Sequence, residues 1–102
     1  MDDRVVLIVS LWLQEGAVEA FEAFERRVVK IQARHGGRIE RAVRLSAPND
    51  ADAPFEVHIV SFPGADSLDA YRADPEMQAL APERAAIFRR TVIHEGREAG
   101  PY

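Results

Sequence analysis

The sequence predicts an α+β domain with the element order βαββαβ, in which helices cover one face of a four-stranded antiparallel sheet. Short apolar, β-rich runs alternate along the chain with stretches whose apolar residues recur every three or four positions. The chain has 102 residues, which is the length of one domain, so these elements are expected to share one core.

The first strand is expected over residues 4–13, where nearly every side chain is apolar. Such a run is typical of a central strand that is covered on both faces. A helix is expected to follow, because one stripe of residues at helical spacing consists of Ala17, Phe21, Phe24, Val28, Ile31 and His35. Gly36 suits the left-handed conformation that ends a helix, so this helix should stop near residue 35.

The second strand is expected over residues 38–45, where polar and apolar side chains alternate. In a regular strand, Ile39, Arg41 and Val43 would share one face. The polar residues 46–54 predict a loop. A third strand is then expected over residues 55–62.

The second helical segment is expected in pieces. Residues 67–73 predict a short helix with Asp66 as the candidate N-cap. Pro75 suits the first position of a further helix, and residues 82–88 predict one more helical turn. The last strand is expected over residues 91–95.

The most apolar strands are the first and the third, so they are expected at the centre of the sheet. The helices can cover only one face of this sheet, yet the first strand is apolar on both faces. The uncovered face therefore needs a partner, and we expect a homodimer formed with a second copy of the same sheet. The domain is expected to span residues 1–96, and residues 97–102 are expected to form a C-terminal tail.

The composition argues against several classes of function. The absence of cysteine removes disulfides, thiol chemistry and cysteine-ligated metals, and the three histidines lie far apart, so no metal site or cofactor is expected. The net charge of -4 argues against a nucleic-acid partner. No apolar run reaches transmembrane length and the N-terminal residues do not form a signal peptide, so a cytoplasmic location without membrane contact is expected.

Four segments carry a family resemblance, and these are Gly36-Gly37-Arg38-Ile39, Ile59-Val60-Ser61-Phe62-Pro63-Gly64, Tyr71 with Asp74-Pro75-Glu76, and His94-Glu95-Gly96. In these segments the chain resembles a bacterial family of domains of unknown function in the dimeric α/β-barrel superfamily. The resemblance implies a ferredoxin-like fold that pairs into a dimeric barrel.

The superfamily is mixed in function, so the resemblance implies no single chemistry. It includes cofactor-independent monooxygenases, muconolactone isomerase-like enzymes, haem-degrading enzymes and proteins of no known activity. The haem-degrading members carry an iron-ligating histidine on the second helix. Residues 63–91 of this chain contain no histidine, which argues against haem.

Four side chains are candidates for a small-molecule site between the sheet and the helices. His58 lies between apolar residues and could be a general base, or else a hydrogen-bonded structural histidine at the dimer interface. Tyr71 could hydrogen-bond a substrate, or else be a core aromatic residue. Trp12 could wall a pocket or fill core volume, and Arg41 could clamp a carboxylate or pair with an acid such as Glu56.

Two functions stay open. The first is the binding or transformation of a small organic molecule by cofactor-independent, monooxygenase- or isomerase-like chemistry, with His58 and Tyr71 catalytic and with Trp12 and Arg41 binding substrate. The second is a non-catalytic dimeric binding or scaffold module. An open pocket that holds a histidine or tyrosine would favour an enzyme, whereas a core with all polar groups paired internally would favour the module.

Overall fold

The computed structural model describes residues 3–46 and 52–102, so most of the loop predicted over residues 46–54 lies outside the described residues. Four strands form one antiparallel sheet, and these are β1 (Val5–Leu13), β2 (Arg38–Arg44), β3 (Glu56–Phe62) and β4 (Phe88–Gly96). The strand order β2-β3-β1-β4 places the two most apolar strands at the centre, as predicted.

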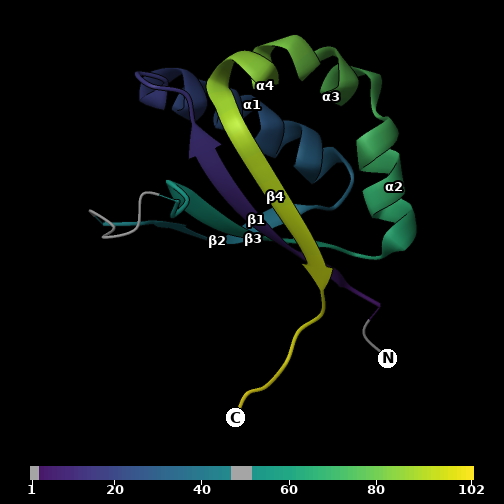
Figure 1. Cartoon of the computed structure of the whole chain (residues 1–102). Helices are drawn as coiled ribbons and strands as arrows, with labels where there is room; N and C mark the ends of the chain where they lie inside the picture. The colour runs from purple at the N-terminus through teal and green to yellow at the C-terminus, as the bar shows by residue number, and fades with distance from the viewer. Residues whose placement is uncertain (1–2, 47–51) are drawn as a thin grey trace.

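The helices all lie on one side of this sheet (Figure 1), and they are α1 (Val18–Arg34), α2 (Ala65–Ala73), α3 (Pro75–Ala79) and α4 (Ala81–Ile87). The predicted α+β, βαββαβ fold class is therefore confirmed. Within the described residues, no helix is long and apolar enough to cross a membrane.

Helix α1 holds the core together by packing its apolar stripe against the sheet. Phe21, Phe24 and Val28 are each at most 4% exposed and form one cluster with Leu11 and Phe88. The rings of Phe21 and Phe24 both meet the ring of Phe88 edge to face, with centroids 5.7 Å apart. This is the stripe that the spacing of apolar residues predicts, and it fixes α1 over the start of β4.

Strand β2 contains a bulge at Glu40. The register with β3 pairs Ile39 and Arg41 with neighbouring β3 residues, so Glu40 has no partner position. Ile39 consequently packs on the helix side, whereas Arg41 and Val43 face the other side. The prediction that Ile39 shares a face with Arg41 and Val43 is therefore wrong, because the bulge shifts the alternation by one residue.

The starts of α2 and β4 differ most from the prediction. Helix α2 begins at Ala65 with Gly64 as its N-cap residue, so Asp66 lies inside the first turn and is not the N-cap. Its carboxylate still lies near the positive end of the helix dipole. Strand β4 begins at Phe88, three residues earlier than predicted, because Phe88 already pairs with Leu13 of β1.

Within the described residues, no helix lies over the second face of the sheet (Figure 1). Ile8 and Ile59 lie opposite each other on this face at the centre of the sheet. Ile8 is 38% exposed, and Val43 at the edge is 46% exposed. The molecule therefore presents apolar sheet surface to its surroundings, as the sequence of the first strand predicts.

Candidate functional site

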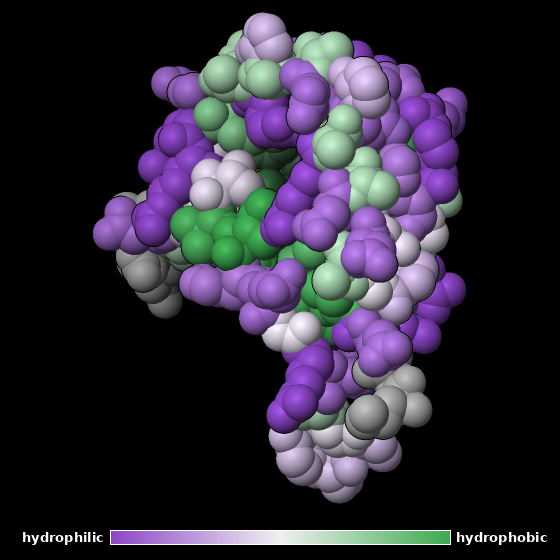
Figure 2. Space-filling model, turned by 90° about the vertical axis from the view of Figure 1, so that its right-hand side faces the viewer, coloured by the Kyte–Doolittle hydropathy of each residue, from purple (hydrophilic) through white to green (hydrophobic). Residues whose placement is uncertain are grey.

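A cavity of about 300 Å³ lies between the sheet and the helices, and most of its lining is apolar. Leu7, Val9 and Leu11 form its base, because alternate residues of β1 point to the helix side of the sheet. Phe24 and Val28 of α1 contribute further apolar wall. Figure 2 shows the side of the molecule where apolar surface is hollowed and bordered by hydrophilic residues.

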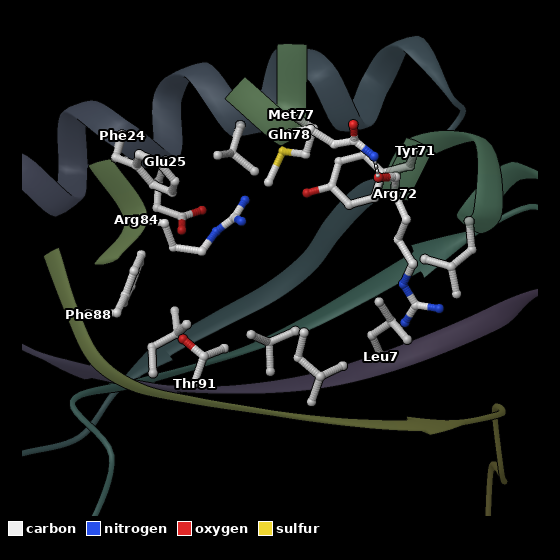
Figure 3. A pocket seen from close by; sticks show the side chains of 15 residues that line it. Leu7, Phe24, Glu25, Tyr71, Arg72, Met77, Gln78, Arg84, Phe88 and Thr91 are labelled. Carbon is white, nitrogen blue, oxygen red and sulfur yellow. Dashed lines mark hydrogen bonds between the residues drawn. The ribbon is translucent and has the colours of Figure 1, made fainter. Parts of the chain in front are cut away.

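The cavity also holds a small set of polar side chains. The carboxylate of Glu25 and the guanidinium of Arg84 lie beside each other, and the hydroxyl of Tyr71 points into the same space (Figure 3). An apolar cavity with a few convergent polar groups is the usual form of a small-molecule site. This combination can hold a mostly apolar molecule and orient it by one or two hydrogen bonds.

Burial changes the proton affinity of two of these groups. It raises the pKa of the Glu25 carboxyl, although the electrostatic influence of His58 and Arg84 acts in the opposite direction. It also raises the pKa of Tyr71, against a hydrogen bond from Gln32 that lowers it. A carboxyl with a raised pKa can accept or donate a proton nearer to neutral pH, while Tyr71 stays a neutral hydrogen-bond donor.

His58 lies on the helix side of β3 but does not line the cavity. It is 4% exposed, and its ring lies 6.3 Å from the ring of Phe21. Its Nε2 is 2.5 Å from Oε2 of Glu56, whose Oε1 accepts a hydrogen bond from Nε of Arg44 at 2.9 Å. His58 is therefore paired internally, and it is not on the exposed apolar face of the sheet.

Trp12 and Arg41 lie on the side of the sheet away from the cavity. The indole N–H of Trp12 donates to the backbone oxygen of Asp52 at 2.8 Å, and the Arg90 guanidinium lies 4.5 Å from the centre of its ring. The expectation that Trp12 and Arg41 line the same pocket as Tyr71 is therefore wrong. Glu56 pairs with Arg44 and not with Arg41, so the alternative pairing considered for Arg41 is not formed either.

Glu25 and Arg84 line the cavity but were not predicted from the sequence. Glu25 could have been. It lies four positions after Phe21 and three before Val28, so it shares their helix face. A lone carboxylate between two core positions of a helix is a signal that could have identified it. Arg84 offers no such signal, because it lies in a short helix whose placement over the sheet depends on tertiary contacts.

Asp74 ties the end of α1 to the helices that cover the cavity. Its Oδ2 lies 2.7 Å from Nε2 of His35 and 3.0 Å from the guanidinium of Arg34. Its Oδ1 accepts the backbone N–H of Glu76 at 2.9 Å, so Asp74 is also the N-cap of α3. These contacts hold the α2–α3 junction, and with it Tyr71, next to α1.

We expect Asp74→Asn to lower the melting temperature at neutral pH. The hydrogen bond from His35, helped by the Glu76 amide and Arg34, holds the pKa of the Asp74 carboxyl below its usual range. A carboxyl with a lowered folded-state pKa stabilises the protein above its unfolded pKa of about 4, and this contribution is lost as the pH falls through the folded value. The melting-temperature difference between variant and wild type should therefore shrink below about pH 4.

The control for this experiment is Asp69→Asn, which changes an exposed carboxylate in the middle of α2. It should leave the melting temperature nearly unchanged across the same pH range. A melting-temperature difference for Asp74→Asn that stays constant down to acidic pH would contradict the assigned role of this carboxylate.

Metal-binding side chains are not gathered at the cavity. Across residues 3–46 and 52–102, no three His, Cys, Asp or Glu side chains come together in a group that could hold a metal ion.

Neither a protein-family model nor a curated protein matches the sequence. Solved structures, by contrast, match nearly the whole chain. A protein of unknown function from Rhodopseudomonas palustris has a TM-score of 0.81 at 16% identity and covers 99% of this chain and 86% of its own. A NIPSNAP-family protein with unknown function from Agrobacterium tumefaciens has a TM-score of 0.72 at 20% identity, over 99% of this chain and 93% of its own.

A variant of a cofactor-independent oxygenase from Streptomyces nogalater also matches, with a TM-score of 0.71 at 19% identity over 98% of this chain and 99% of its own. At these identities the likeness shows the fold and does not carry over an activity. The chain therefore shares the ferredoxin-like fold of these proteins.

Proposed function

We propose that the protein binds a small, largely apolar organic molecule in the cavity between the sheet and the helices. The observation that carries this proposal is the cavity of about 300 Å³, with an apolar lining and the polar groups of Glu25, Arg84 and Tyr71. Of the four residues singled out from the sequence, Tyr71 is the one that lines this space, and we assign it the role of a hydrogen-bond donor to the ligand.

We further propose that the ligand is transformed by cofactor-independent chemistry, as in a monooxygenase or an isomerase. The structural likeness to a cofactor-independent oxygenase supports this choice. Proton transfer would be the contribution of the cavity, because Glu25 and Tyr71 both present exchangeable protons to it. His58, which does not line the cavity, would act through its electrostatic influence on Glu25.

A non-catalytic binding module is the second candidate. The observation that favours it is the pairing of His58 with Glu56 and of Glu56 with Arg44, which gives this histidine a structural role in the core. Both candidates require a ligand in the same cavity, and they differ in whether the protein transforms that ligand chemically.

The ligand proposal is tested by filling the cavity. Thr91 lies on β4 at the cavity and is exposed, so Thr91→Trp places an indole in the ligand space without disturbing the buried core. We expect methylnaphthalene, followed by its fluorescence, to bind the wild-type protein and to lose binding in Thr91→Trp. The matched control is Glu95→Trp, an exposed position on the same strand and face but outside the cavity, which should bind like the wild type. Equal binding by both variants, or none by the wild type, would contradict the proposal.

We propose that a second copy of the chain covers the exposed apolar sheet face. A sheet face with Ile8 and Ile59 at its centre can be self-complementary about a two-fold axis. A domain of this size also gains from burying more apolar area than it can bury alone.

Sedimentation velocity tests the dimer. The wild type should sediment as a dimer and Ile8→Lys as a monomer, because a charge at the centre of a buried interface is not tolerated. Val29→Lys replaces an equally exposed apolar residue on α1 and should stay dimeric. A monomeric wild type would refute this assembly.

A further inference from the structure

The cavity contains charged side chains of both signs, so its charge alone does not indicate an anionic or a cationic ligand. Arg72 and Arg84 both line the space, and two guanidinium groups in one cavity would ordinarily indicate an anionic ligand. Glu25 lies in the same space and carries the opposite charge. The preference of the cavity therefore depends on where this carboxylate sits relative to the arginines.

Glu25 lies beside Arg84 and apart from Arg72. Figure 3 shows its carboxylate next to the Arg84 guanidinium, while the Arg72 side chain extends toward Leu7 at the far end. Arg84 is also 5.8 Å from the ring centre of Phe24, one residue before Glu25. An anion that approached Arg84 would come close to the Glu25 carboxylate and be repelled by it.

The carboxylate of Glu25 is available as an acceptor. Within residues 3–46 and 52–102, Glu25 forms no hydrogen bond or ion pair that meets ordinary distance limits. A partly buried carboxylate without a donor is unfavourable, so a ligand hydroxyl or N–H placed there would complete its hydrogen bonding. Such a ligand would bind more tightly than a purely apolar one.

We propose that Glu25 determines the ligand specificity of the cavity: it selects neutral, mostly apolar molecules that donate a hydrogen bond, and it rejects carboxylates despite the two arginines. This inference rests on the proposed function and assigns the chemical class of its ligand. The charged groups around Glu25 are Arg84 on α4 and His58 and Glu56 on β3, with the neutral Tyr71 hydroxyl on α2. Glu25 is thus the position where one substitution reverses the preference.

Three probes that differ in one group test this assignment. They are methylnaphthalene, naphthol and naphthoate, substituted at the same ring carbon. We expect the wild type to prefer naphthol over methylnaphthalene by about tenfold at pH 8, because a hydrogen bond to a charged group contributes that much. This preference should weaken as the pH falls, because burial raises the pKa of Glu25 and the protonated carboxyl loses its advantage as an acceptor.

Glu25→Gln keeps the shape of the side chain and removes its charge. We expect it to weaken naphthol binding by about tenfold and to leave methylnaphthalene binding unchanged. Naphthoate binding should become stronger, because no negative charge then repels the ligand carboxylate from Arg84. The matched control is Glu19→Gln, at an exposed position on the same helix, which should match the wild type with all three probes.

The outcomes separate this inference from the proposed function. If all three probes bind wild type and Glu25→Gln with the same affinities, the cavity binds ligands but Glu25 does not select them, and the inference is overturned. If none of the three binds the wild type, the proposed function fails and the inference falls with it.

Discussion

Phe21→Ala should reduce the free energy of unfolding by about 3–5 kcal/mol, the usual effect of truncating a fully buried phenylalanine. Phe21 is 2% exposed, and its ring meets those of Phe55 and Phe88 edge to face at 5.9 and 5.7 Å. It also lies against His58. Truncation would leave a cavity where α1, β3 and β4 meet, and the closely packed surroundings would fill it only in part.

A loss of this size is a large part of the wild-type free energy of unfolding, which is about 5–15 kcal/mol for a domain of this length. Urea unfolding followed by circular dichroism measures it, at one protein concentration so that any association contributes equally. The control is Val29→Ala on the same helix. The Val29 side chain is 41% exposed, so this substitution should change the free energy of unfolding by less than about 0.5 kcal/mol. Equal effects of the two substitutions would show that α1 does not pack as described.

Glu56→Ala should reduce the free energy of unfolding by about 3 kcal/mol, because it removes one member of a buried ion-pair network. The carboxylate is held between the Arg44 guanidinium and the His58 imidazole, and its side chain is 10% exposed. Without it, the ring nitrogen of His58 is buried without a partner. The expected loss lies at the lower end of the range for such networks, because Arg44 is partly exposed and can turn to solvent.

Glu22→Ala is the matched control, because Glu22 pairs with the same arginine. Its carboxylate lies 3.4 Å from Arg44 but is 44% exposed, so its removal should cost less than about 1 kcal/mol. Urea unfolding of both variants therefore compares a buried and an exposed partner of one guanidinium. Similar losses for the two would contradict the structural role assigned to the pairing of His58 and Glu56.

The element order and the central strands followed from local pattern alone. The apolar stripe of α1 and the continuous apolar run of β1 both reflect burial that repeats at a fixed spacing, and such spacing is visible in the sequence. Pro75 likewise predicted the start of α3, because a proline restricts only its own and the neighbouring residues. The second apolar face of the sheet was predicted from the same patterns, because β1 is apolar on both faces.

The site could be predicted only in part. Tyr71 was expected to point inward and does line the cavity. The side of the sheet on which His58 lies could not be read from β3, because both faces of that strand mix polar and apolar residues; its register with β1 places His58 on the helix side. Trp12 and Arg41 were assigned to the cavity although β1 and the bulged β2 turn them to the other face.

Two features depended on tertiary structure entirely. The bulge at Glu40 reverses the faces of the β2 residues that follow it, and it arises from pairing with β3, which no pattern within β2 records. Glu25 of α1 and Arg84 of α4 are more than fifty residues apart in the sequence, and they line the same cavity because both helices pack over the sheet. Local spacing thus decided which segments became helices and strands, whereas contacts between distant segments decided which side chains share the cavity.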